Sequence, residues 1–280
     1  MGVTPLRTAL RPSLVDGLFY PARKETLAAD VDGLLGRPET PRAARWGIIS
    51  PHAGYEYAGP VMGAAFRAIA ERAVRTAVVI GPVHRDAEEA IYLPESSAFS
   101  TPLGAAPVDE EALAALAAAD PMFQRNDIPH LEEHCLELQL PFLLRLFPGV
   151  SIVPLLVGAG GRSGAETLAR CLSAVFGPRE DSTVYVVTAN MASYMTGTDT
   201  RRESQEMEAL LARGDWKGVL RAAETRRISA CGTSCVAGLL ALAGSRCEVQ
   251  ILARARSEDP DEDPARTVHY AAVSIQQGPP

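Results

Sequence analysis

The chain has 280 residues, of which 47% are hydrophobic and 22% are charged, and its formal net charge is -7. These proportions are ordinary for a globular protein, and the negative charge disfavours nucleic-acid binding through a basic surface. No apolar run reaches the ~20 residues that cross a bilayer, and the first residues lack the apolar core of a signal peptide. We therefore expect a cytoplasmic protein without membrane spans, whose five cysteines are free thiols rather than a disulfide framework.

Short apolar, β-branched runs alternate with helical patterns along the chain. Strands are expected at residues 46–50, 77–80, 90–93, 152–157, 184–188, 249–253 and 268–275. Helices are expected at 59–72, 109–119 (with Asp109 as N-cap), 130–147, 166–176, 201–213 and 233–243. The alternation predicts an α/β fold with a central, mostly parallel sheet flanked by helices, in one domain covering residues 1–280. Mixed strand direction is expected because the last two strands are joined only by the acidic segment Ser257–Pro264, a predicted solvated loop.

Two histidine motifs directly follow predicted strands. His52 lies in Pro51–Tyr55 (PHAGY), after the strand at 46–50, and His84 lies in Gly81–Arg85 (GPVHR), after the strand at 77–80. Ligands of open α/β sheets bind outside the carboxyl ends of the strands. A single histidine is more often structural, but two at equivalent strand ends, of only five in the chain, favour metal binding or acid–base chemistry.

A cysteine motif precedes the predicted helix at 233–243. Cys231 lies in Ser229–Cys235 (SACGTSC), where the positive end of the helix dipole favours a thiolate. Cys235, one turn later, is expected to pack inside the helix layer. Two imidazoles and a thiolate suit Fe(II), Cu or Zn by ligand type, and three protein ligands leave open positions on the metal.

A competing metal motif lies in the predicted helix at 130–147. His130-Leu131-Glu132-Glu133-His134 matches the H-x-x-E-H pattern of one class of metallopeptidase, and both histidines would share a helix face. Because Pro129 precedes the motif, we expect His130 to lie at or before the first turn. A metallopeptidase is therefore kept as a minor alternative.

The motifs taken in order resemble the Memo family, also called AmmeMemoRadiSam system protein B. The match covers nearly the whole chain. It rests on Arg11, Phe19–Pro21 (FYP), Pro51–Tyr55, Gly81–Arg85, Thr101–Gly104 (TPLG), Glu133-His134, Gln139–Phe142 (QLPF), Cys231-Gly232 and Tyr270–Val273 (YAAV).

The resemblance implies a fold similar to the class III extradiol dioxygenases, in which two histidines and a glutamate bind Fe(II). In Memo proteins a cysteine takes the place of the glutamate. This implies His52, His84 and Cys231 as the metal ligands here, with Fe(II) as first choice, Cu as the alternative and Zn less favoured. The family's system name also suggests a radical-SAM partner.

One segment departs from the family pattern Ser-Ser-Asp-x-Ser-His-Tyr. Here Asn190 replaces the Asp, and Ser193 replaces the His that corresponds to the acid–base group of the dioxygenases. A serine hydroxyl cannot replace an imidazole as a proton shuttle, so His134 becomes the candidate acid–base group. Tyr55, Asn190, Ser193 and Tyr194 are expected to bind substrate or support the metal ligands.

Two functions follow from these features. The first is an iron-dependent, dioxygenase-like oxidoreductase acting on a small organic substrate. The second is a module that binds metal or a partner without catalysis, which the loss of the acid–base histidine favours. The sequence does not specify the oligomeric state.

Overall fold

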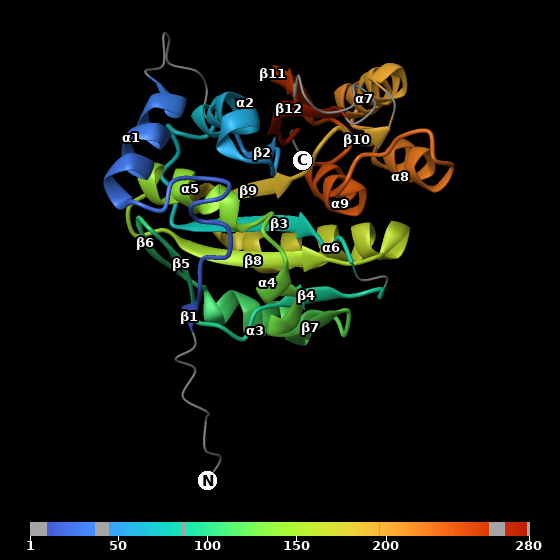
Figure 1. The fold of residues 1–280 in the computed structure, drawn as a ribbon. Helices are drawn as coiled ribbons and strands as arrows, with labels where there is room; N and C mark the ends of the chain where they lie inside the picture. Colours follow the sequence, from blue (N-terminus) through green and yellow to red (C-terminus); the bar gives the residue numbers. More distant parts are fainter. Residues whose placement is uncertain (1–9, 37–44, 86–87, 196, 258–266, 279–280) are drawn as a thin grey trace.

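The computed structural model describes residues 10–36, 45–85, 88–195, 197–257 and 267–278, without the side chains of 194–199. Its larger sheet runs in the order β10-β12-β2-β9-β3-β8-β4-β7, with β11 paired to β12, and a small sheet runs β1-β5-β6 (Figure 1). The larger sheet contains β2 (Gly47–Ser50), β3 (Thr76–Pro82), β4 (Ile91–Leu93), β7 (Phe123–Arg125), β8 (Ser151–Val157), β9 (Thr183–Thr188), β10 (Ala192–Met195), β11 (Glu248–Arg256) and β12 (Thr267–Gln276). The small sheet contains β1 (Leu10–Arg11), β5 (Ala98–Thr101) and β6 (Gly104–Pro107).

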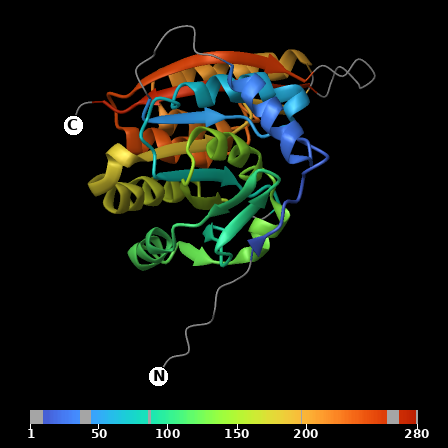
Figure 2. The ribbon, with the colours of Figure 1, turned by 90° about the vertical axis from the view of Figure 1, so that its left-hand side faces the viewer.

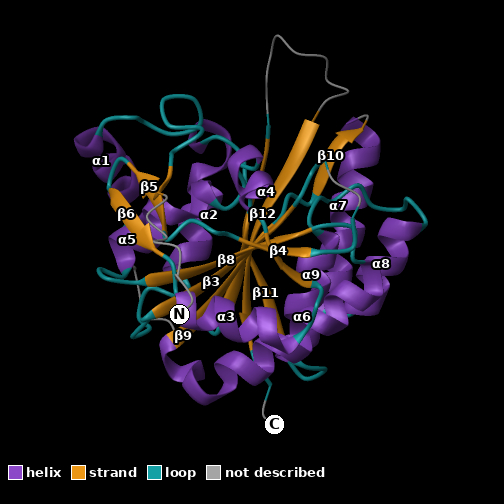
Figure 3. Ribbon diagram, turned by 90° about the horizontal axis from the view of Figure 1, so that it is seen from below, coloured by secondary structure: helices purple, strands orange, loops and turns teal. Residues whose placement is uncertain are grey.

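Helices surround the larger sheet, whose strands fan across the centre of the molecule (Figures 2 and 3). One group packs together as α1, α2 and α5, and a second as α3, α6, α8 and α9, with α7 against α8 and β10–β12. Their bounds are α1 (Lys24–Leu35), α2 (Tyr55–Arg67), α3 (Glu110–Ala119), α4 (Asp127–Glu132), α5 (Leu140–Leu146), α6 (Gly161–Phe176), α7 (Gly197–Ala212), α8 (Trp216–Glu224) and α9 (Thr233–Ala243), with 3-10 turns at Glu137–Gln139 and Gly177–Ser182. Among the helices of the described residues, none is long and apolar enough to cross a membrane.

Most predicted elements are confirmed. The sheet is mixed, since β2, β9, β3 and β8 pair in parallel while β11 and β12 form an antiparallel pair. Asp109 is the N-cap of α3 and accepts a 2.9 Å hydrogen bond from the Ala112 amide. All five cysteines are free. The acidic loop proposed for Ser257–Pro264 lies outside the described residues after Ser257.

The long helix predicted over 130–147 is wrong. The chain instead forms α4, leaves the helical conformation at Glu133 (φ -98°, ψ 133°), and resumes in a 3-10 turn that leads into α5. The predicted helix at 59–72 begins four residues earlier, at Tyr55, and ends at Arg67. Helices α1 and α8 and the β5–β6 hairpin were not predicted, because these short segments acquire their order from packing rather than from a strong local pattern.

A buried ion pair fastens the N-terminal segment to the body. Arg11 and Glu137 are 1% and 0% exposed, and their Nη1 and Oε2 atoms lie 2.6 Å apart. Arg11 also donates to the carbonyls of His130 and Glu133, while Glu137 accepts from the Tyr20 hydroxyl at 2.6 Å. Because every charged group has several partners, the pair is fully satisfied, and loss of either member would leave an uncompensated buried charge.

We expect Glu137→Gln to lower the free energy of unfolding by about 3 kcal/mol, because the charge of Arg11 would stay buried without its counter-ion. Denaturant titration followed by circular dichroism measures this change. Asp32→Asn is the matched control, since Asp32 pairs with Arg145 on the surface with side-chain exposures of 51% and 41%. In the control the free energy of unfolding should fall by less than about 1 kcal/mol. An equal fall in the two variants would contradict the stabilising role of the buried pair.

Candidate metal centre

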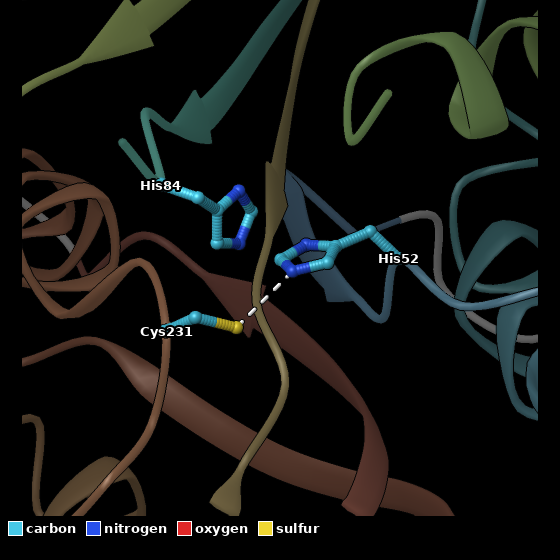
Figure 4. Close-up of side chains that lie close together, drawn as sticks. All are labelled: His52, His84 and Cys231. Carbon is cyan, nitrogen blue, oxygen red and sulfur yellow. Dashed lines mark hydrogen bonds between the residues drawn. The ribbon is translucent and has the colours of Figure 1, made fainter. Parts of the chain in front are cut away.

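Three adjacent parallel strands bring the predicted ligands together. In the sheet β9 lies between β2 and β3, so the carboxyl ends of these strands share one edge. His52 follows β2 and His84 follows β3, while Cys231 arrives from the segment before α9 (Figure 4). One donor atom from each residue lies within 4.8 Å of the other two. The sequence-predicted trio is therefore a real cluster in space.

His52 is buried, and its ring is fixed by a contact on the nitrogen that faces away from the cluster. Its Nδ1 lies 2.8 Å from the Thr188 hydroxyl, and Gln139 donates to the same hydroxyl at 3.3 Å. Its Nε2 lies 3.1 Å from the sulfur of Cys231, on the side that faces the cluster. Thr188 therefore orients the ring so that Nε2 is the atom offered to a metal.

His84 is held in the same way, but by a carboxylate. Glu133 accepts from the His84 backbone amide at 2.6 Å and lies 2.7 Å from Nδ1 of its ring. A carboxylate behind a ligating histidine fixes the tautomer and increases the basicity of the other nitrogen. Glu133 is not among the site residues predicted from the sequence, although its place beside His134 in a family motif is a signal that could have identified it. Thr188 and Gln139 were missed because their contacts join segments distant in sequence.

Cys231 lies next to the N-cap Gly232 of α9. Gly232 adopts the left-handed conformation (φ 74°), and a Cβ there would come within 3.0 Å of the Thr188 carbonyl oxygen. Glycine therefore permits the close approach of the Cys231 loop to the end of β9. The sulfur accepts a 3.2 Å hydrogen bond from the backbone amide of Asn190. Cys235 is buried in α9, as expected.

The cluster favours a thiolate beside a charged imidazole. Burial opposes ionisation of Cys231, but the charge of His52 and the hydrogen bonds from His52, His84 and Asn190 outweigh it and lower the thiol pKa to about 5. Hydrogen bonds to Cys231 and Glu133 raise the pKa of His84 to about 10. The thiol is therefore deprotonated above about pH 5, and a metal that binds His84 must displace its proton.

The donor set fits a metal ion. Ligands about 2.0–2.3 Å from a tetrahedral metal lie roughly 3.5 Å from one another, which is compatible with the observed spread. Both Nδ1 atoms are already engaged by Thr188 and Glu133, so the Nε2 atoms and the sulfur are the atoms that could bind a metal ion. One thiolate and two imidazoles suit a borderline or soft first-row metal.

Comparison with known sequences shows the family to which the chain belongs. A sequence model described as Memo-like protein matches residues 11–274. The chain belongs to the Memo family. A MEMO1 family protein of Thermotoga neapolitana is 31% identical over 95% of this chain and 99% of its own length, and one of Methanopyrus kandleri is 26% identical over 96% and 99%. The crystal structure of an uncharacterized protein from Escherichia coli K12 covers 81% of this chain and 98% of its own, with 12% identity and a TM-score of 0.49.

Of the two residues expected to depart from the Memo pattern, Asn190 contacts the centre. Asn190 is buried, and its Oδ1 accepts from the His52 amide at 3.2 Å, so it supports both His52 and Cys231. Ser193 is partly buried in β10, and its amide donates to the Ser229 hydroxyl at 3.2 Å. The side chain of Tyr194 lies outside the described residues. Tyr55 is buried and donates its hydroxyl to the Leu138 carbonyl.

His134 lies at the centre, whereas His130 does not. The ring of His134 is 6.0 Å from that of His52 and 5.9 Å from that of His84, centroid to centroid. Burial, followed by the charges of His52 and His84, lowers its pKa to about 4, so it is neutral at pH 7. His130 instead lies against Phe99, with Nε2 3.1 Å from the Tyr92 carbonyl oxygen.

The metallopeptidase alternative is therefore wrong in its structural premise. Helix α4 ends at Glu132, before the motif is complete, so His130 and His134 do not share a helix face. Glu133, which would be the peptidase general base, is instead engaged with His84.

We expect the metal-free protein to show one thiolate titrating near pH 5, measured by the ultraviolet absorbance of the thiolate. Burial raises the pKa of each of the other cysteines, Cys135, Cys171, Cys235 and Cys247, so these remain protonated across the neutral range. Cys231→Ser should remove the step, whereas Cys247→Ser should keep it. A first step only above pH 8 would contradict the thiolate assignment.

We expect Glu133→Gln to weaken metal binding about 10- to 100-fold, because the amide loses the charge that holds His84. Titration with Co²⁺, followed by its visible absorption, measures the dissociation constant. Glu132→Gln changes the exposed neighbouring residue in the same way and should bind as the wild type does. Equal affinities in the two variants would show that Glu133 does not support the ligand.

Proposed function

We propose that this Memo-family protein is an iron-dependent oxidoreductase that acts on a small organic substrate. The observation that carries the proposal is the set of three donors, His52, His84 and Cys231, each held by neighbouring groups and together too few to saturate an iron ion. Structural metal sites usually have four protein ligands, whereas three leave room for substrate or O₂. Bound Fe(II) would supply one-electron redox chemistry.

The residues around the centre have separate tasks in this proposal. Thr188 and Glu133 orient the two imidazoles, and Asn190 stabilises the negative charge of Cys231 through its amide. The ring of His84 lies on the more accessible side, with 35% of its side chain exposed, whereas His52 is 3% exposed. Substrate therefore approaches from the His84 side.

His134 is the acid–base candidate in this proposal. Because it is neutral at pH 7, it would accept a hydrogen bond or a proton from substrate rather than hold a proton in reserve. Ser193 cannot take that task, since a hydroxyl does not titrate near neutrality. Any reaction would therefore differ from that of a dioxygenase with the usual acid–base histidine.

A second candidate function is metal or partner binding without catalysis. The observation in its favour is the position of Asn190: its Oδ1 accepts from the His52 backbone amide and its own backbone amide donates to Cys231, so these groups support the candidate ligands and not a substrate. Copper as well as iron fits such a module by ligand type.

Anaerobic reconstitution with Fe(II) tests the proposal. We expect one iron per chain in the wild type and binding at least about 100-fold weaker in Cys231→Ala, which loses the thiolate ligand. O₂ consumption with ascorbate as electron donor should exceed that of the metal-free protein. His134→Gln should lower the rate of O₂ consumption more than it lowers iron affinity.

Cys247→Ala is the matched control, because Cys247 is outside the cluster, and it should bind iron as the wild type does. Iron uptake by Cys231→Ala equal to that of the wild type would contradict the assignment of Cys231 as a metal ligand. Binding of one iron per chain without O₂ consumption would contradict the proposed enzymatic activity and support the function of metal binding without catalysis.

A further inference from the structure

A concave region is lined by the segment between β1 and α1 and by the helices α1 and α2. These two helices pack against each other (Figure 1). Its volume is about 560 Å³, within the range of pockets that hold small organic molecules. Its wall is formed in part by the turn Gly17–Pro21, which contains the Phe19-Tyr20-Pro21 motif. The turn depends on Gly17, whose φ of 77° favours glycine and whose amide donates to the Tyr20 carbonyl at 2.7 Å.

The charged residues described in the lining of this cavity are acidic. Among the described residues, Asp30 of α1 and Glu56 of α2 are the charged ones that line it, and no arginine, lysine or histidine of this part of the chain does. Both are exposed, and neither carboxylate has an ion-pair or hydrogen-bond partner among the described residues. Asp32, two positions further along α1, is by contrast paired with Arg145. The carboxylates at the cavity are therefore available to a cation from outside the chain.

The rest of the wall is aromatic and aliphatic. Phe19, Tyr20 and Tyr55 contribute rings, and Leu18 and Leu34 contribute alkyl groups. The hydroxyls of Tyr20 and Tyr55 already donate to Glu137 and to the Leu138 carbonyl, and both residues are buried, so the half-buried Phe19 is the ring most open to the cavity. Aromatic rings beside carboxylates attract an organic cation through both its charge and its apolar body.

The cavity wall also contains a glycine with open space beside it. A Cβ at Gly33, which lies in α1 and lines the cavity, would have no atom within 4 Å. Gly33 has no positive φ, so a larger side chain fits its backbone and would improve the helix propensity of α1. This position therefore allows the cavity to be filled without disturbing the fold.

We propose that this cavity binds a small organic ammonium ion, with its charge facing Asp30 and Glu56 and its apolar body against Phe19, Leu18 and Leu34. The site is distinct from the metal centre. Among the described residues, the cavity lining includes none of His52, His84 and Cys231. Phe19 lies between the two regions in contact terms, since it lines the cavity and its ring packs on His134 with the centroids 5.0 Å apart. The proposal does not depend on the metal or on the proposed oxidoreductase activity.

Calorimetric titration of the full chain, treated with a chelator so that amine cannot bind a metal, tests this site. The probe is phenethylammonium, and 2-phenylethanol is its neutral counterpart of similar shape. We expect saturable binding of one amine per chain and at least about fivefold weaker binding of the alcohol. The double variant Asp30→Asn, Glu56→Gln should lose affinity for the amine to a similar degree while its affinity for the alcohol is unchanged.

Variants of α1 provide the matched controls. Gly33→Leu should abolish binding by filling the cavity, whereas Gly33→Ala should retain binding and unfold at a higher denaturant concentration. Glu25→Gln removes an exposed carboxylate of the same helix that does not line the cavity, and should leave the dissociation constant unchanged. Equal affinities for amine and alcohol, absence of saturable binding, or wild-type binding by Gly33→Leu would each overturn the proposal.

Discussion

The parallel pairing of β9 with β2 on one side and β3 on the other is the constraint on which the metal centre depends. It sends three strand ends to one edge of the sheet, so that His52, His84 and the Thr188–Asn190 segment meet although they are distant in the sequence. Cys231 joins them only because Gly232 lets its loop approach the Thr188 carbonyl. A buried, apolar sheet thus positions a polar cluster without contributing a ligand of its own.

Hydrogen bonds around the cluster orient its three side chains so that one potential metal-binding atom of each faces the other two. Thr188 and Glu133 occupy the Nδ1 atoms, which leaves the Nε2 atoms for a metal, and the Asn190 amide supports the thiolate. Burial alone would keep Cys231 protonated. The charge of His52 and the hydrogen bonds from His52, His84 and the Asn190 backbone amide together reverse that preference, although burial is the largest single effect on the thiol pKa.

The N-terminal segment links this centre to the rest of the molecule. Arg11 is held by Glu137 and by the carbonyls of His130 and Glu133, and Tyr20 donates to the same Glu137. Phe19, carried between these anchors, packs on His134 with one part of its surface and lines the acidic cavity with another. One buried ion pair therefore supports both the wall of the metal centre and the wall of the cavity.

The sequence by itself determined the α/β class, most strands, the Asp109 cap and the three candidate ligand residues. The class, the strands and the cap follow from local patterns, such as apolar runs and a capping side chain. The candidate ligands follow from motifs at strand ends and before a helix, which the resemblance to the Memo family groups into one site. Only the tertiary structure decided the break at Glu133, which turns this carboxylate toward His84 and separates His130 from His134. It also decided the roles of Thr188, Gln139 and Asn190, because each acts through contacts with residues far away in the chain, which no local pattern encodes.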